Sequence, residues 1–111
     1  MWNNYSFLIH SDIMYAINRH NEIMCGERLT LLDGAILCLV KSFHETDRKF
    51  FMSNNEMKKL FASDPGTIQR SVDRLVRKGL LSKEKEYTGA RQRRYLKYNV
   101  ESVTNLIKQS E

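Results

Sequence analysis

Two short helix patterns and a hairpin pattern follow one another within residues 53–98, with only a few residues between them. Ser53 and Glu56 form a capping pair three residues apart, which predicts the start of a helix. Asp64 followed by Pro65 predicts the start of the next helix, because Asp caps helices and Pro fits the first helical position. Helices this short are marginal on their own, so they are expected to pack on a shared core.

The helix predicted over residues 65–78 has two unlike faces. Its apolar face carries Ile68, Val72, Leu75 and Val76. Its opposite face centres on Gly66, Arg70, Asp73 and Arg77, with Thr67, Gln69 and Arg74 on the flanks. One face can therefore anchor the helix while the other presents arginine to a partner. An ordinary solvated face is the alternative for these arginines. Asp73 is expected to pair with Arg77 or Arg70 along the helix, and contact with a cytosine is the alternative for this residue.

An alternating pattern after Gly79 predicts a hairpin. Residues 80–87 form an extended run, residues 88–90 supply a turn with a central glycine, and residues 91–100 alternate again. The basic residues near its tip are Lys83, Lys85, Arg91, Arg93 and Arg94. The returning strand is the stronger candidate for contact with phosphates, because charges of opposite sign alternate along the first strand.

The positive charge of the chain is concentrated in this same region. Residues 65–98 carry ten basic and three acidic side chains, a net charge of +7, whereas the whole chain has a net charge of +5. The flanking regions are therefore close to neutral or slightly acidic. Such a local excess is the electrostatic pattern of a surface that binds a polyanion.

The chain before residue 53 predicts two helices and a short strand. Ser11 can cap a helix that ends at Gly26, with apolar positions at Ile13, Ala16, Ile17, His20 and Met24. Thr30 and Asp33 form another capping pair, and the helix that follows over 31–43 is apolar almost all round. We expect this helix to be the most buried element. Residues 50–52 are apolar and too few for a helix, so they predict a short strand.

After the hairpin, Asn99 can cap a last helix whose apolar face carries Val100, Val103, Leu106 and Ile107. One proline and five glycines among 111 residues favour a single helix-rich domain with short connections. Its expected parts are an N-terminal extension with a helix at 1–29, a core at 30–98 and a C-terminal helix at 99–111. Cys25 and Cys38 both fall in apolar helical patterns, so they are expected to be buried thiols.

Other classes of protein are poorly supported by the residues. No apolar run approaches the roughly 20 residues that a membrane-spanning helix needs, so we expect a soluble, cytoplasmic protein without a membrane partner. The three histidines and two cysteines lack metal-ligand spacing, and no glycine-rich phosphate loop or nucleophile motif is present. We therefore expect no metal, no cofactor and no enzymatic activity.

The stretch Thr67-Ile68-Gln69-Arg70-Ser71-Val72-Asp73-Arg74-Leu75-Val76-Arg77-Lys78-Gly79-Leu80-Leu81 resembles the recognition helix and first wing strand of winged helix-turn-helix DNA-binding proteins. The segment 55–60 is similar to the first helix of that motif, and Arg94-Tyr95-Leu96 is similar to its second wing strand. The resemblance covers residues 30–98. It implies an α+β, mostly α fold: a winged helix-turn-helix with extra N-terminal and C-terminal helices.

The resemblance also implies roles for the basic and polar residues. The recognition helix 65–78 would face base edges with Thr67, Gln69, Arg70, Arg74 and Arg77. The start of the preceding helix would hold a phosphate with Ser53, Asn54 and Asn55. The basic wing 82–95 would reach the backbone or the minor groove with Lys83, Lys85, Arg91, Arg93 and Arg94.

Double-stranded DNA is thus the expected partner, and a sequence-specific transcriptional regulator is the expected function. A replication-initiator or mobile-element module is one alternative, because a compact apolar N-terminus ahead of this unit is similar to initiator domains of plasmids and phages. A protein-interaction winged domain is another, although such domains usually lose the basic wing. The terminal helices could close the core or form a homodimer that binds two half-sites about one turn apart.

Overall fold

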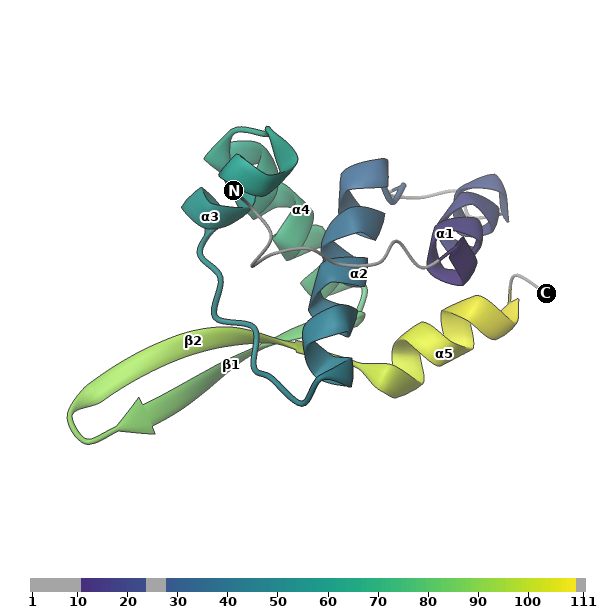
Figure 1. The fold of residues 1–111 in the computed structure, drawn as a ribbon. Coiled ribbons are helices and arrows are strands. Elements are labelled where there is room, and N and C mark those ends of the chain that lie inside the picture. Colours follow the sequence, from purple (N-terminus) through teal and green to yellow (C-terminus); the bar gives the residue numbers. More distant parts are fainter. Residues whose placement is uncertain (1–10, 24–27, 110–111) are drawn as a thin grey trace.

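The computed structural model describes residues 11–23 and 28–109, and these form five helices and a two-stranded antiparallel sheet (Figure 1). The elements are α1 (Ser11–Ile23), α2 (Leu31–Glu45), α3 (Asn54–Phe61), α4 (Pro65–Arg77), β1 (Leu81–Thr88), β2 (Arg91–Tyr98) and α5 (Val100–Gln109). The fold is α+β and mostly helical. The order of α3, a turn, α4 and a hairpin, with extra helices at both ends, is consistent with the expected winged helix-turn-helix, and the predicted α+β, mostly α class is confirmed.

Three of the helices begin at the capping residues that the sequence predicts. Thr30 and Asp33 form the capping box of α2, and Ser53 and Glu56 form that of α3. Asp64 caps α4 by accepting hydrogen bonds from the amide and the hydroxyl of Thr67, at 3.0 and 2.7 Å. These bonds, first that from the hydroxyl, hold the pKa of Asp64 below its ordinary value. The helix starts are therefore fixed by local side-chain chemistry.

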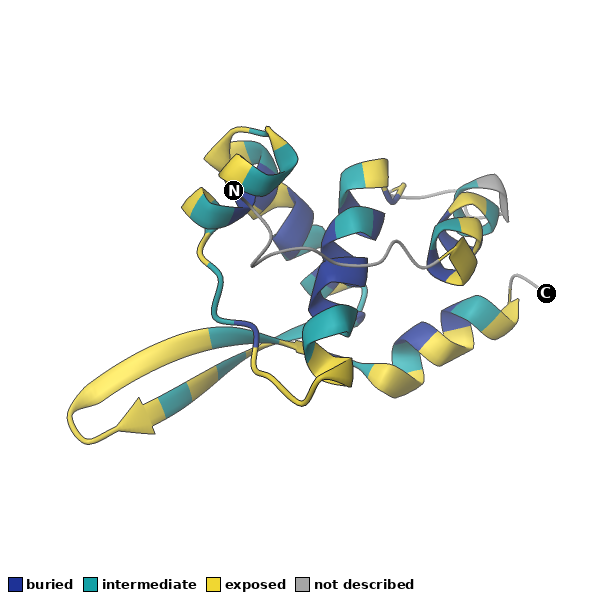
Figure 2. Cartoon of the chain, in the orientation of Figure 1, coloured by how far each residue is buried: buried dark blue, intermediate teal, exposed yellow. Residues whose placement is uncertain are grey.

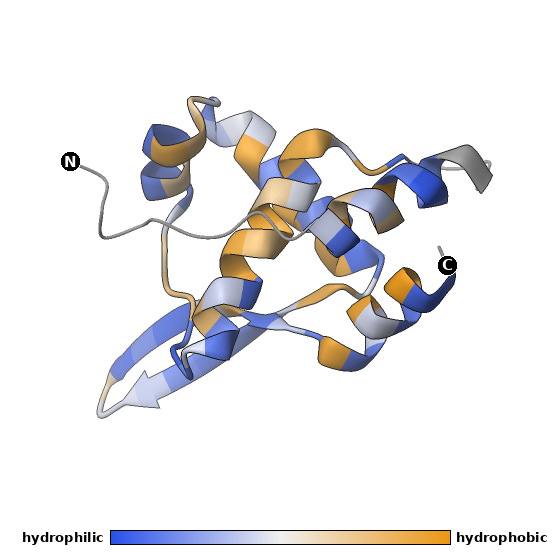
Figure 3. Cartoon of the chain, turned by 45° about the vertical axis from the view of Figure 1, so that its right-hand side comes forward, coloured by the Kyte–Doolittle hydropathy of each residue, from blue (hydrophilic) through white to orange (hydrophobic). Residues whose placement is uncertain are grey.

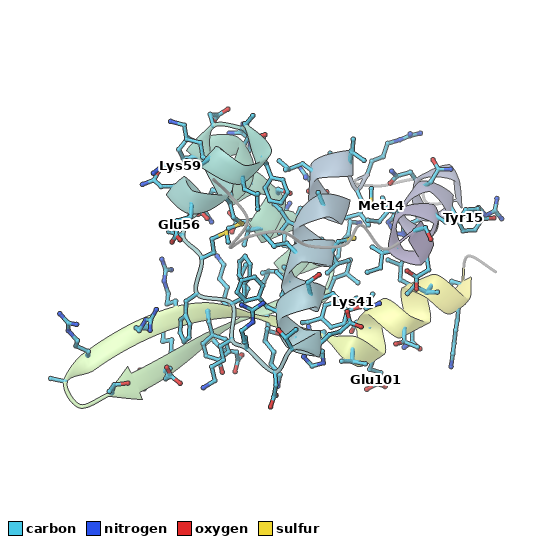
Figure 4. The ribbon with its side chains drawn as sticks, in the orientation of Figure 1. Met14, Tyr15, Lys41, Glu56, Lys59 and Glu101 are labelled. Carbon is cyan, nitrogen blue, oxygen red and sulfur yellow. The ribbon has the colours of Figure 1, made fainter. Side chains whose placement is uncertain are left out.

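Helix α2 is the centre of the core, as the sequence predicts. Figure 2 shows dark, buried residues along most of its length, and it packs against α1, α4 and β2. Its fully or almost fully buried side chains are Asp33, Ile36, Leu37, Cys38, Leu39 and Val40. Helix α1 approaches α2 closely at Gly34. The Met14 side chain of α1 points toward α2 (Figure 4), and a Cβ added at Gly34 would lie only 2.7 Å from its sulfur. Cys38 is a buried thiol, as expected, whereas Cys25 lies outside the described residues.

The hairpin of β1 and β2 extends away from the helices and is mostly hydrophilic (Figures 1 and 3). Its turn contains Gly89 with a φ of 62°, in the left-handed region that glycine adopts without strain. Only its base is buried, where Leu81 pairs with Tyr98. The projecting part therefore offers its side chains to solvent instead of to the core.

Two local predictions are wrong in detail. Residues 50–52 do not form a strand; Phe50 makes a single bridge to Leu96 beside the hairpin. Asn99 precedes α5, but its side chain donates to the carbonyl of Gly79 at 2.7 Å and accepts from the hydroxyl of Ser82 at 3.1 Å. The Asn99 side chain thus ties the segment after α4 to the start of α5.

Helices α1 and α5 pack against each other at the end of the molecule opposite the hairpin tip (Figure 1). Most of the apolar positions predicted from periodicity are buried, namely Ile13, Ala16, Ile17, Val103 and Leu106, whereas Val100 is exposed, contrary to the prediction. These helices therefore close the core from one side. The N-terminal aromatic residues before residue 11, as well as Met24 and the expected stop at Gly26, lie outside the described residues.

Candidate nucleic-acid interface

Helices α3 and α4 meet at a turn that sets the direction of α4. Ala62 ends α3 with a φ of 54°, a left-handed conformation, and Asp64 then begins α4 two residues later. Helix α4 buries Ile68, Val72 and Leu75 against the core. Its opposite face is consequently turned to solvent along its whole length.

The exposed face of α4 is basic. Arg70 and Arg77 are exposed, as are Gly66 and Gln69. A guanidinium nitrogen of Arg70 donates to the hydroxyl of Thr67 at 3.2 Å, which orders the arginine along the first turn of the helix. Gln69, Arg70 and Arg77 thus lie on the exposed face of α4, whereas Thr67 is half-buried.

Arg74 does not. Its guanidinium donates to both carboxylate oxygens of Asp33, at 2.8 and 2.9 Å, and its side chain is only 18% exposed. Asp33 itself is fully buried and also accepts a hydrogen bond from Ser71. The expected outward orientation of Arg74 is therefore wrong: the buried carboxylate at the start of α2 draws this flanking arginine inward, because an unpaired buried charge would be costly.

A chain of hydrogen bonds joins α3, α4 and the hairpin across the exposed face. Asn54 donates to the side-chain oxygen of Gln69 at 2.6 Å, and the Gln69 amide donates to Asp73 at 2.9 Å. The ammonium of Lys83 donates to the same oxygen of Asp73 at 3.0 Å. This last bond, a link of α4 to β1, was not predicted; the sequence suggested only Arg77 and Arg70 as partners of Asp73.

The bond from Lys83 stabilises the ionised form of Asp73. Together with the weaker contribution of the Gln69 amide, it outweighs partial burial and holds the pKa of Asp73 below its ordinary value. Asp73 therefore remains a fixed negative charge within the basic surface at neutral pH. We call these four residues, Asn54, Gln69, Asp73 and Lys83, the bridging network.

The strand register divides the basic residues of the hairpin between its two faces. Lys85 pairs with Arg94 and Lys83 with Leu96, so Lys83, Lys85 and Arg94 share the face that contacts α4. Glu86 pairs with Arg93 and Thr88 with Arg91, so both of these arginines lie on the other face. The sequence predicts all five as one group, but a strand alternates its side chains, and only three of them lie on the hairpin face beside α4.

Arg93 is held by an aromatic contact on its own face. Its guanidinium lies 3.9 Å from the ring centre of Phe51, and the Phe51 ring meets that of Tyr95 edge to face at 5.5 Å. Lys49 forms an ion pair with Glu86 on the same face. The Arg93 guanidinium is therefore held against Phe51, whereas Arg94 lies on the hairpin face beside α4.

A cleft of about 370 Å³ lies where α3, α4 and the hairpin meet. Ser53, Asn54 and Asn55 line it from the start of α3, and Lys83 and Arg94 line it from the hairpin. The positive end of the α3 dipole and two cationic side chains suit a negatively charged group, while the amides of Ser53 and Glu56 already donate within the capping box. The structure thus brings together the predicted phosphate-binding residues of α3 and part of the predicted wing.

Other kinds of site find no support in the described part of the chain. Residues 11–23 and 28–109 contain no cluster of three or more histidine, cysteine or acidic side chains that could hold a metal ion. Within the same residues, no helix combines the length and the apolar character needed to span a membrane.

Comparison with known proteins finds similarity to a solved structure. Neither a protein-family model nor a curated protein sequence matches this chain. Among solved structures, the chain is similar to a possible transcriptional regulator from Methanosarcina mazei Go1, with a TM-score of 0.53 and 23% sequence identity. The match covers 96% of this chain and 85% of that chain. At this identity the likeness concerns the fold alone, and it extends over nearly the whole chain, terminal helices included.

Proposed function

We propose that this protein is a sequence-specific transcriptional regulator that binds double-stranded DNA through α4 and the face of the hairpin beside it. One observation carries this proposal: the start of α3, the exposed face of α4 and the Lys83 face of the hairpin meet around one cleft and are joined by the bridging network. A helix and a projecting ribbon on one surface match the grooves and backbone of a duplex.

Base recognition belongs to α4 in this proposal. Arg70 lies on the exposed face, and arginine can bond bidentately to guanine. Gln69 can do the same to adenine, while Thr67 and Arg77 complete the helix face. Each such bidentate pair discriminates against a wrong base by about 1–3 kcal/mol. Arg74 is left out, because its guanidinium is committed to Asp33.

Phosphate contacts belong to the start of α3 and to the wing. Ser53, Asn54 and Asn55 line the cleft together with Arg94, which suits one backbone phosphate. Lys83 and Lys85 continue this face toward the tip. Arg91 and Arg93, on the reverse face of the hairpin, would add weaker contacts to neighbouring phosphates or to the minor groove.

A role in transcription is supported by the structural neighbour, which is named a possible transcriptional regulator. We infer that the protein represses by occupying its site, since steric exclusion requires only binding. The expected homodimer through α1 and α5 stays a prediction; a footprint with two half-sites about one helical turn apart would support it.

The test is selection of bound fragments from random duplexes, followed by measurement of the dissociation constant at several salt concentrations. Neutralising about six phosphates predicts a slope near −5 in a plot of log affinity against log salt. A dissociation constant weaker than about 100 μM for every duplex near physiological salt would rule out the proposed function.

Three variants then locate the surface. Arg70→Ala should relax the preference at one base position, whereas Arg94→Ala should weaken all sequences about equally. Arg93→Ala is the matched control on the opposite face of the same strand and should weaken binding less than Arg94→Ala. Equal affinities for wild type and all three variants would place the binding surface elsewhere.

A further inference from the structure

The bridging network contains a negative charge where a DNA-binding surface would gain from a positive one. Asp73 lies on α4 between Gln69 and Arg77, and its side chain is 40% exposed. Its carboxylate neutralises Lys83, one of the three cationic residues on the hairpin face beside α4. A surface built only for attraction to phosphates would lack this carboxylate.

The same carboxylate also accepts a hydrogen bond from Gln69, a residue suited to recognising a base. Gln69 uses its amide nitrogen on Asp73 and its oxygen on Asn54, so both ends of the side chain are engaged. Bidentate recognition of adenine needs both of these ends. These two internal hydrogen bonds hold Gln69 in one orientation and compete with bonds to a base, and Asp73 competes with a phosphate for the ammonium of Lys83.

We propose that Asp73 is a specificity-determining residue that restrains Gln69 and Lys83 in the free protein and disfavours DNA that cannot replace their bonds. This inference rests on the proposed function. On a duplex with the preferred bases, Gln69 replaces its hydrogen bond to Asp73 with hydrogen bonds to a base. On any other duplex Gln69 stays with Asp73, and the carboxylate repels the nearby backbone, so selectivity rises at the expense of affinity.

Because Asp73 carries a negative charge, it weakens binding to DNA of any sequence. Non-specific binding is supplied almost wholly by phosphate neutralisation, so a carboxylate at the interface weakens it. Removing the charge should strengthen non-specific binding about three- to tenfold near physiological salt, the range expected for one partly screened charge. Lys83 is also freed to neutralise a phosphate, which should steepen the salt slope by about one.

The experiment compares wild type with Asp73→Asn on two duplexes, the preferred one from the selection and a scrambled one. Asparagine retains an acceptor for Gln69 and Lys83 but loses the charge. We expect affinity for the scrambled duplex to rise more than affinity for the preferred one, so that the specificity ratio falls at least threefold. Asp73→Glu, which keeps the charge, should retain the selectivity of wild type.

Glu84→Gln is the matched control. It changes the net charge equally, but Glu84 pairs with Tyr95 on the hairpin face away from Lys83, so its specificity ratio should not change. Thermal unfolding of each variant separates a binding effect from loss of the fold.

Three results would overturn the inference. One is a specificity ratio for Asp73→Asn within twofold of wild type. Another is an equal fall of the ratio in Glu84→Gln, which would show a general charge effect. The third is loss of affinity for the preferred duplex alone, which would make Asp73 a direct reader of a base. Absence of duplex binding by wild type would instead refute the proposed function.

Discussion

The pair of Asp33 and Arg74 leads to a quantitative prediction, because it is a buried ion pair that fastens the recognition helix to the core. Asp33 is fully buried, and besides Arg74 it accepts hydrogen bonds from the amide of Thr30, at 2.8 Å, and from Ser71. Replacing Arg74 by methionine keeps the aliphatic stem and removes the guanidinium. The Asp33 carboxylate then loses both of its bonds to a cation while it remains buried.

The magnitude follows from what is left behind. Removing one partner of a buried ion pair costs about 3–5 kcal/mol, because the other charge is uncompensated. Two neutral donors remain on Asp33, and Arg74 is 18% exposed, so water can enter where the guanidinium was. We therefore expect the lower end, a loss of about 3 kcal/mol in the free energy of unfolding. For a domain of this size, the melting temperature should fall by roughly 10–20 °C.

The assay is equilibrium unfolding in urea, followed by circular dichroism. Arg70→Met is the matched control from the same helix: Arg70 is exposed and makes a single neutral hydrogen bond at 3.2 Å, so the loss should stay below about 0.5 kcal/mol. Measuring Asp33→Asn alone and in combination with Arg74→Met completes a double-mutant cycle, with an expected coupling energy of about 1–3 kcal/mol.

If Arg74→Met and Arg70→Met lose the same free energy of unfolding, the inward orientation of Arg74 is wrong. A folded Arg74→Met protein should also keep the base preference of wild type. If Arg74→Met changed the base preference but not the free energy of unfolding, Arg74 would instead belong to the proposed DNA-binding surface.

Further predictions concern backbone conformation and pH. Gly79 has a φ of 75° and open space around it, so Gly79→Ala should destabilise the fold by about 1 kcal/mol, whereas Ala62→Gly, at a φ of 54°, should stabilise it by about 0.5–1 kcal/mol; thermal unfolding measures both. Burial and the nearby Lys78 ammonium lower the pKa of His20 below its ordinary value of 6.5. The unfolded chain thus takes up the proton first, so stability should fall as the pH drops below about 6.5, and His20→Gln should flatten that part of the profile. A pH profile of His20→Gln identical to that of wild type would contradict this assignment.

What the sequence predicts well is what neighbouring residues determine. Thr30 with Asp33, Ser53 with Glu56, and Asp64 before Pro65 each fix a helix start within three residues. Such caps need no knowledge of the rest of the fold. The order of helices and hairpin follows from them and from the apolar periodicity.

What the sequence does not predict depends on contacts between distant segments. Arg74 flanks the exposed face by periodicity alone, and only the approach of Asp33, 41 residues away, turns it inward. Lys83 meets Asp73 because the hairpin folds back beside α4. The capping role of Asn99 fails for the same reason, since the Gly79 carbonyl and the Ser82 hydroxyl compete for its side chain.

The division of the wing arginines lay within reach of the sequence. Side chains alternate along a strand, and a central turn at residues 89–90 pairs Lys85 with Arg94. Counting outward from that turn separates Arg94 from Arg91 and Arg93. Which face meets α4 could not be counted, because it depends on how the hairpin leaves the recognition helix.

The proposed DNA-binding surface can be examined in one measurement: titration of the ¹⁵N-labelled protein with its selected duplex, followed through amide chemical shifts. We expect the shifted amides to cluster at residues 53–55, along the exposed face of α4 at residues 66–77, and in the hairpin at residues 83–94. Helices α1 and α5 should change little where they face away from this surface. Shifts confined to α1 and α5, or no shifts at protein concentrations well above the measured dissociation constant, would contradict a DNA-binding role for α4 and the hairpin.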